Sequence, residues 1–192
     1  MDAKRARLGK VLVTKEKVAQ IVCKTADWIC AECAANAPDV LTGKEPVHLI
    51  IILKGAVVYG MAVMKELHQR GIQTRLEFYR TESYGHGTSG GEVRTLLDVQ
   101  DTLAGTVSFV IEDIIDRGET LDYVMSILSR RKPQYLGVCA LLNKPSRRCV
   151  ALPPSYHIFT GMDIEGFVGG FGLDFDEMFR DEECVCLVEF VE

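Results

Sequence analysis

Residues 106–120 read TVSFVIEDIIDRGET, and this stretch predicts the kind of fold. Its first residues, through Ile111, are mostly apolar, as in a strand that is buried on both faces of a sheet. Glu112 and Asp113 follow directly, and a turn from Asp116 to Gly118 then opens a helix. A buried strand that passes through a glycine turn into a helix is typical of a parallel sheet flanked by helices.

The rest of the chain repeats this alternation of strands and helices. Apolar residues recur at helical spacing over 14–35, where Thr14 is the expected N-cap, and again over 57–70, before Gly71. The segment 81–91 is polar and rich in glycine, so we expect a mobile loop there. The alternation predicts an α/β fold with a mostly parallel twisted sheet. Strands are expected at 47–53, 74–80, 92–98, 106–113, 135–142, 156–160 and 184–191, with a third helix at 120–131.

Composition narrows the class of protein. The chain has 192 residues, is 47% hydrophobic and has a formal net charge of −5, which suits a single globular domain over residues 1–192. The mild acidity argues against nucleic acid as a partner. Apolar runs such as 49–53 are far shorter than the ~18 residues that span a bilayer, and the basic segment 1–10 lacks the apolar core of a secretory signal. We therefore expect a cytoplasmic protein with no membrane partner.

The cysteines have two interpretations. Their odd number, seven, favours free thiols in a reducing compartment. Cys30 and Cys33 form a C-x-x-C, and Cys184 and Cys186 form a C-x-C, a combination that a zinc ion would accept. No flanking histidine supports a zinc site, and Cys30 falls on the apolar stripe of the first helix. Small buried hydrophobic residues are the favoured interpretation.

The turn at residues 116–120 carries the first indication of chemistry. Its backbone amides stand at the start of a helix, which is a binding site for anions, and Gly118 lets the backbone approach a ligand closely. Three acids, Glu112, Asp113 and Asp116, precede the turn and would repel a bare phosphate. A sugar phosphate with Mg²⁺ fits both features, because hydroxyl groups or the cation would meet the acids. The alternative is a capping aspartate beside solvated acids at a strand end.

The motif VIEDIIDRGET resembles the phosphoribosyl diphosphate signature of type I phosphoribosyltransferases. More narrowly, the chain is similar to hypoxanthine-guanine phosphoribosyltransferases along nearly its whole length, and it carries four more of that family's motifs in the family's order. The resemblance implies the type I fold, with a small hood built from about residues 1–15 and 160–192. The four motifs are Leu53-Lys54-Gly55, Ser83-Tyr84-Gly85, Asn143-Lys144-Pro145 with Arg147-Arg148, and the run from Phe167 to Asp174 that continues through Phe179-Arg180-Asp181.

The resemblance implies a purine-salvage transferase. Such an enzyme moves phosphoribose from 5-phosphoribosyl 1-diphosphate to N9 of hypoxanthine or guanine, uses Mg²⁺, and works as a homodimer or homotetramer. Asp116 would be its general base, and Glu112, Asp113 and Asp174 would be its metal ligands. The resemblance also allows a cis peptide before Lys54. The implied substrate-binding residues are Lys54, Gly55, Ser83, Tyr84, Glu112, Asp113, Ile114, Ile115, Asp116, Arg117, Gly118, Glu119, Thr120, Lys144, Phe167, Val168, Asp174 and Arg180.

The side chains expected at the base site suit a 6-oxopurine. Lys144 has three donors and no acceptor, so it binds a 6-oxo group but not a 6-amino group. Phe167 offers a ring face for stacking a base, and Val168 offers backbone groups to its edge. Two alternatives stay open: a preference for xanthine, and a non-catalytic, nucleotide-sensing regulator on the same fold. Asp116 together with Lys144 favours catalysis, since a sensor does not need them.

Three residues depart from the family pattern. Arg117 stands where a small hydroxyl residue usually contacts the 5′-phosphate, so it either grips that phosphate or turns to solvent. Ala56 replaces a frequent second glycine, which is tolerable unless that position needs a positive φ. Glu119 adds negative charge beside the phosphate turn. Arg147 and Arg148 are interpreted as a solvated pair.

Overall fold

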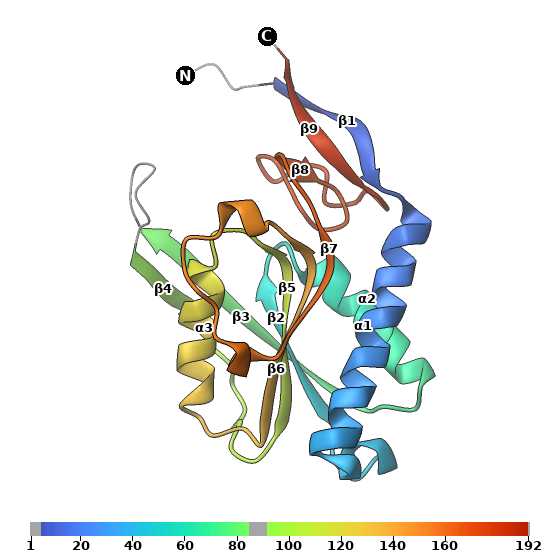
Figure 1. The fold of residues 1–192 in the computed structure, drawn as a ribbon, viewed down its shortest axis with the longest axis vertical. Coiled ribbons are helices and arrows are strands. Elements are labelled where there is room, and N and C mark those ends of the chain that lie inside the picture. The colour runs from blue at the N-terminus through green and yellow to red at the C-terminus, as the bar shows by residue number, and fades with distance from the viewer. Residues whose placement is uncertain (1–4, 85–91, 192) are drawn as a thin grey trace.

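The computed structural model describes residues 5–84 and 92–191, and its main feature is a six-stranded sheet (Figure 1). All neighbouring strands in it are parallel except β3 and β4, which are antiparallel. The prediction of a mostly parallel sheet is therefore confirmed. The strand order is β4-β3-β2-β5-β6-β7, formed by β2 (Val47–Leu53), β3 (Thr74–Tyr84), β4 (Glu92–Leu97), β5 (Val107–Ile115), β6 (Tyr135–Asn143) and β7 (Ile158–Asp163).

Helices cover both faces of this sheet (Figure 1): α1 (Lys15–Asn36) and α2 (Val57–Gln69) lie on one face, and α3 (Glu119–Ser129) lies on the other. Alternate residues of β2 divide between the two cores. Leu49 belongs to the core with α1 and α2, and Ile50 belongs to the core with α3. A strand with helices on both faces must be apolar throughout, which is the pattern of 47–53. Thr14 caps α1 as expected, accepting a hydrogen bond from the backbone N–H of Lys17 at 3.3 Å.

A second, three-stranded sheet lies beyond the carboxyl ends of the main sheet (Figure 1). Its order is β1-β9-β8, with β1 (Arg5–Val13), β9 (Val185–Val191) and β8 (Val168–Gly169). Both pairings are antiparallel, so the two ends of the chain meet in one small sheet. This sheet is the hood of the fold prediction, although the apolar pattern did not indicate β1 or β8 as strands.

A further difference from the predicted elements is at residues 81–84. They were expected in a mobile loop but extend β3, because they pair with β4 from Thr81 opposite Thr95 to Tyr84 opposite Glu92. An ion pair across the two strands supports the extension: Arg94 Nη2 lies 2.7 Å from Glu82 Oε2. The remainder of that expected loop, residues 85–91, lies outside the described residues.

Short 3-10 helices account for most of the other differences. They are η1 (Pro38–Thr42), η2 (Pro145–Arg147) and η3 (Pro154–Tyr156), and η3 delays the start of β7 by two residues. Each begins at a proline, whose fixed φ suits the first turn of a helix.

Cys33 lies on the buried face of α1, and all seven cysteines are free. Within residues 5–84 and 92–191, no helix is long and apolar enough to cross a membrane.

Candidate active site

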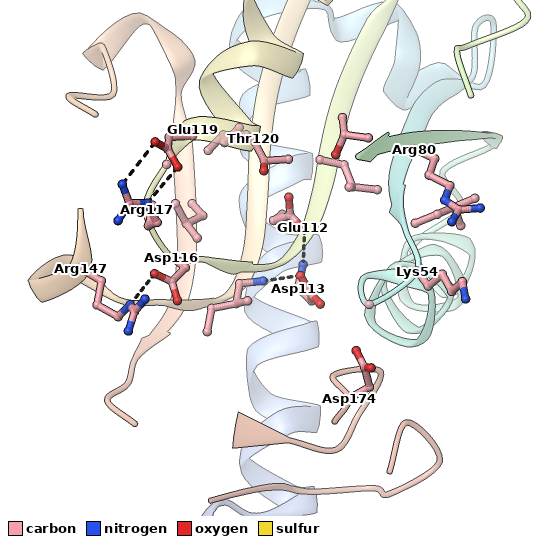
Figure 2. Close-up of a pocket in the computed structure, with 18 of the residues that line it drawn as sticks. Lys54, Arg80, Glu112, Asp113, Asp116, Arg117, Glu119, Thr120, Arg147 and Asp174 are labelled. Atoms are coloured by element: carbon pink, nitrogen blue, oxygen red, sulfur yellow. Dashed lines mark hydrogen bonds and ion pairs between the residues drawn. The ribbon is translucent and has the colours of Figure 1, made fainter. Parts of the chain in front are cut away.

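Two cavities open at the carboxyl edge of the main sheet, with about 1300 Å³ and 1100 Å³ of open space. The larger is lined by the ends of β2, β3 and β5 and by the start of α3, and the second lies between the end of β6 and the hood. Figure 2 shows Lys54 and Arg80 on one side of the first cavity and Arg117 with Glu119 on the other. The two cavities adjoin, because both are lined by Asp113, Ile114, Asp116, Arg147 and Asp174.

The phosphate turn predicted at residues 116–120 lines the larger cavity along its whole length. Gly118 precedes α3 with φ 90°, a left-handed conformation that favours glycine. A Cβ atom there would also lie 3.0 Å from Arg148 Cδ. The free amides of the first turn of α3 therefore face a cavity, as an anion-binding helix start requires.

Arg117 pairs with Glu119 in this turn, while its side chain stays 41% exposed. Its Nε lies 2.9 Å from Oε2 of Glu119, and both side chains line the larger cavity. The hydrogen bond from Arg117 lowers the pKa of Glu119, and the same bond raises the pKa of Arg117. The two departures from the family pattern thus compensate each other: the added negative charge of Glu119 is neutralised beside the phosphate turn.

The acidic pair lies at the end of β5, in the middle of the site (Figure 2). Glu112 is 7% exposed, and burial, followed by the neighbouring charge of Asp113, raises its pKa. Oε1 of Glu112 accepts the backbone N–H of Asp113 at 3.1 Å. Oδ1 of Asp113 accepts the backbone N–H of Ile114 at 2.8 Å. Backbone donors therefore orient both carboxylates before any ligand binds.

The Lys54-Gly55 loop packs directly against Asp113. A Cβ atom on Gly55 would lie 1.6 Å from Oδ2 of Asp113, so only glycine fits there. The carbonyl oxygen of Gly55 in turn lies 2.2 Å from where a Cβ of Gly172 would be, and Gly172 has φ 99°. The peptide between Leu53 and Lys54 is cis, as the resemblance allowed. Ala56 has φ −74°, so the alanine there is accommodated.

A network of ion pairs joins this loop to the segment after β8. Lys54 Nζ lies 2.8 Å from Oε1 of Glu177, and Arg180 Nη2 lies 2.9 Å from Oε2 of the same carboxylate. Arg180 also pairs with Oδ1 of Asp174 at 2.8 Å and donates to the carbonyl oxygen of Gly172 at 2.7 Å. The hydrogen bonds from Lys54 and then Arg180 lower the pKa of Glu177 to about 2.

Asp116 lies where the two cavities meet, and three cationic residues hold it. Its Oδ1 is 2.7 Å from Arg147 Nε, its Oδ2 is 3.4 Å from Lys144 Nζ, and its carbonyl oxygen accepts from Arg148 Nη1 at 3.0 Å. The interpretation of Arg147 and Arg148 as a solvated pair is therefore wrong for the partly buried Arg148, whereas Arg147 is 57% exposed but also pairs with Asp116. The 3-10 helix η2 turns the chain back after β6 and brings both side chains to the phosphate turn.

The second cavity contains the residues expected at the base site. Lys144 is 6% exposed and lines it together with Phe167, Val168 and Leu173. The ring of Phe167 is half exposed, with the rings of Phe175 and Phe190 at centroid distances of 6.0 and 6.2 Å. Val168 is buried because β8 pairs with β9. A cavity with a half-exposed ring and a buried lysine in its lining suits a flat, polar-edged ligand.

Sequence reasoning missed several residues of the site. Arg80 and Thr81 line the larger cavity from β3, and Glu165 lines the second. Ser83 and Tyr84 lie on β3, and their side chains lie outside the described part of the structure. No motif marked the missed residues. The one usable signal for Arg80 and Thr81 was their position at the carboxyl end of a predicted parallel strand.

The predicted metal ligands are not brought together as a ready-made site. Among the described residues, no group of three or more His, Cys, Asp or Glu side chains is arranged to hold a metal ion, which also leaves the zinc alternative without a site. Glu112 is buried, whereas Asp113 and Asp174 line both cavities. One or two carboxylates beside a ligand's own oxygens are the usual setting for Mg²⁺, so this donor set fits that ion.

Comparisons with known proteins point to one family. The family model described as "Phosphoribosyl transferase domain" matches residues 18–176. The hypoxanthine-guanine phosphoribosyltransferase of Crithidia fasciculata is 33% identical over 94% of this chain and 85% of its own length. The hypoxanthine phosphoribosyltransferase of Haemophilus influenzae is 33% identical over 79% of this chain and 83% of its own.

A solved structure agrees with the sequence relatives. The ternary substrates complex of a mutant hypoxanthine phosphoribosyltransferase from Trypanosoma cruzi superposes with a TM-score of 0.85 and 28% identity, covering 95% of this chain and 96% of that one. The likeness in fold therefore agrees with the sequence matches along nearly the whole chain. The protein is a phosphoribosyltransferase and belongs to the phosphoribosyl transferase domain family.

Proposed function

We propose that the enzyme transfers the phosphoribosyl group of 5-phosphoribosyl 1-diphosphate to N9 of hypoxanthine or guanine. The observation that carries the proposal is that two cavities meet at Asp113 and Asp116. One is lined by the phosphate turn, and the other is lined by a buried lysine and a half-exposed aromatic ring. A phosphoribosyl donor in the first cavity and a purine in the second would meet at those residues, where the new bond to C1′ must form. The curated relatives named for hypoxanthine support the choice of base.

The ribose 5-phosphate half would occupy the centre of the larger cavity. The amides of residues 117–120 and the hydroxyl of Thr120 would bind the 5′-phosphate. Glu112 and Asp113 would hold the ribose hydroxyls, since backbone donors already fix both carboxylates. The raised pKa of Glu112 supports this role, because a protonated carboxyl can donate a hydrogen bond as well as accept one.

The diphosphate would lie beside Lys54, Gly55 and Arg180. Two cations, Lys54 and Arg180, line the cavity there together with Gly55. Asp113 and Asp174 would hold Mg²⁺, which would neutralise charge on the leaving diphosphate. As the C1′–O bond breaks, the electron pair leaves with the diphosphate, which these cations stabilise.

The base would lie flat beneath Phe167, with its 6-oxo group on Lys144. The ammonium group of Lys144 can only donate, so it favours a 6-oxopurine over adenine. N9 forms the new bond to C1′, and the proton that the base loses at its imidazole ring would pass to Asp116. Arg147 and Lys144 hold the carboxylate of Asp116 in position. Asp116 lines both cavities, which is where a general base for this reaction must lie.

Two further parts of the proposal concern the oligomeric state and the location of the enzyme. A homodimer or homotetramer is proposed from the family alone, and a solved T. cruzi relative is described in terms of its oligomeric state. A cytoplasmic location is proposed because all seven cysteines are unbridged, which suits a reducing compartment.

One experiment tests the activity. The protein is incubated with 5-phosphoribosyl 1-diphosphate, Mg²⁺ and one purine at a time (hypoxanthine, guanine, xanthine or adenine), and the nucleotides formed are separated and quantified. IMP and GMP should form rapidly, with adenine nearly inactive. A dominant xanthine product would replace the proposed base preference, and no nucleotide from any base would reject the proposed reaction.

A further inference from the structure

The carboxylate of Glu177 contacts both cations to which the proposed function assigns the diphosphate. Its two oxygens lie 2.8 Å from Lys54 Nζ and 2.9 Å from Arg180 Nη2, and all three side chains line the larger cavity. A carboxylate with one oxygen on each cation offers the same kind of charge-assisted contacts as two oxygens of a phosphate group. In the free enzyme this acid therefore occupies the contacts that the substrate needs.

We propose that Glu177 is an internal competitor of diphosphate, which neutralises Lys54 and Arg180 in the free enzyme and leaves them when diphosphate binds. The inference rests on the proposed function, because that function assigns the two cations to diphosphate. The inference concerns a residue that none of the motifs indicated. It gives Glu177 a role opposite to that of an ordinary binding residue, because removing the charge of Glu177 should tighten the binding of diphosphate.

The loop around Glu177 allows such an exchange. Its backbone N–H donates to Oδ2 of Asp174 at 2.9 Å, so the main chain stays anchored while the side chain moves. Arg180 keeps its bonds to Asp174 and to the carbonyl oxygen of Gly172 when the carboxylate leaves. Among the residues that the structure describes, Lys54 has no other ion-pair partner, so the departure frees its ammonium group completely.

Solvent exposure makes the exchange inexpensive. The side chain of Glu177 is 61% exposed and that of Lys54 is 49% exposed. Ion pairs at such exposure contribute little, since water solvates both partners well after they separate. Diphosphate carries more charge than one carboxylate, so it would displace Glu177 from the two cations. After the reaction, the return of the Glu177 carboxylate to these cations would help the diphosphate product to leave.

The test compares variants by calorimetric titration with inorganic pyrophosphate in the presence of Mg²⁺. Glu177→Gln keeps the shape of the side chain and removes its charge, so its dissociation constant should fall about threefold to tenfold, the range expected for displacing one or two exposed ion pairs. Glu177→Asp keeps the charge but retracts it by one carbon, so it should also bind more tightly than the parent, by a smaller factor. A thermal melt of each variant confirms that it is folded.

Two controls separate the contact from a general charge effect. Glu183→Gln removes an equally exposed glutamate that pairs with Lys15 at 2.7 Å outside the cavity. Asp176→Asn removes the same charge one residue away, from a side chain that does not line the cavity. Both should bind pyrophosphate within twofold of the parent, and a gain there equal to that of Glu177→Gln would overturn the inference.

The remaining outcomes distinguish this inference from the proposed function. Lys54→Ala should weaken pyrophosphate binding. If it does, and Glu177→Gln binds pyrophosphate as the parent does or more weakly, then the diphosphate assignment stands and the competitor role is wrong. If Lys54→Ala leaves binding unchanged, the diphosphate assignment fails and the inference fails with it.

Discussion

Replacing Lys144 by methionine should remove most of the discrimination between hypoxanthine and adenine. The side chain is 6% exposed and lines the second cavity, with its Nζ 3.4 Å from Oδ2 of Asp116. Methionine has nearly the same length and volume but no donor, so Lys144→Met keeps the packing and removes the contact to the 6-oxo group together with the 3.4 Å pair to Asp116. Asp116 retains Arg147, at 2.7 Å, so no acid is left unpaired.

The expected size of the effect follows from this geometry. A hydrogen bond from a charged donor in a buried site contributes about 1.5–3 kcal/mol, so kcat/KM for hypoxanthine should fall by about tenfold to 150-fold. Adenine should not lose activity, because its amino group no longer faces a donor. A site in which the wrong analogue leaves buried polar groups unpaired can favour the right one by roughly 10⁴–10⁵ in kcat/KM. The variant should retain only part of the parent's ratio of kcat/KM for hypoxanthine to kcat/KM for adenine.

The assay measures kcat/KM for both bases at saturating 5-phosphoribosyl 1-diphosphate and Mg²⁺. Lys65→Met is the matched control, since Lys65 is an exposed lysine on α2 that lines neither cavity. The control should keep the ratio of the parent enzyme. If Lys144→Met also keeps that ratio, Lys144 does not select the base and the assignment of the second cavity is wrong.

Four further results are expected. Asp116→Asn should lower kcat by about 10²–10⁴-fold, because an amide cannot accept the proton, and a single-turnover rate within twofold of the parent would remove the base assignment. Gly55→Ala should abolish turnover, since its Cβ would lie 1.6 Å from Asp113 Oδ2, and unimpaired steady-state kinetics would contradict this packing. Excess EDTA should stop nucleotide formation and added Mg²⁺ should restore it; a rate insensitive to EDTA rejects the metal. Burial raises the pKa of Glu112, so the folded state loses stability relative to the unfolded state as pH rises above the ordinary pKa of a glutamate. Glu112→Gln removes this loss, so it should raise the melting temperature by an amount that grows from pH 5 to 8 in metal-free buffer. A difference in melting temperature that does not depend on pH would be inconsistent with the raised pKa.

The elements predicted best are those whose pattern is visible within a short stretch of sequence. The run 47–53 is apolar at every position except His48 because α1 and α2 cover one face of β2 and α3 covers the other. The turn at Gly118 was recognisable because a left-handed backbone favours one residue type. Such signals lie within a few residues of the structure that they determine.

The hood was less accessible to pattern analysis. Its strand β1 pairs with β9 across nearly the whole chain, with Leu8 opposite Val188. Most of its side chains are only partly buried, so it lacks a continuous apolar run or a strict alternation. The same limit explains the error at residues 81–84, where pairing with β4 and not hydrophobicity keeps a polar segment extended.

The site residues that were missed form contacts between distant parts of the sequence. Arg147 reaches Asp116 only because η2 reverses the chain, and Glu177 meets Lys54 across 123 positions. A charged residue on a loop is usually solvated, so its sequence neighbours give no reason to place it in a site. The motifs therefore predicted which segments form the site but not which charges neutralise one another within it.

That pattern of charges explains why the proposed reaction should need a divalent cation. The larger cavity is lined by as many acids as cations, even when the buried Glu112 is left out, and several of these groups already pair with each other. Such a cavity has no excess positive charge with which to attract a diphosphate, and Lys54 and Arg180 are shared with Glu177. The substrate must therefore bring positive charge with it, which Mg²⁺ bound to its oxygens supplies. The lining cations are Lys54, Arg80, Arg117, Arg147 and Arg180, and the acids besides Glu112 are Asp113, Asp116, Glu119, Asp174 and Glu177.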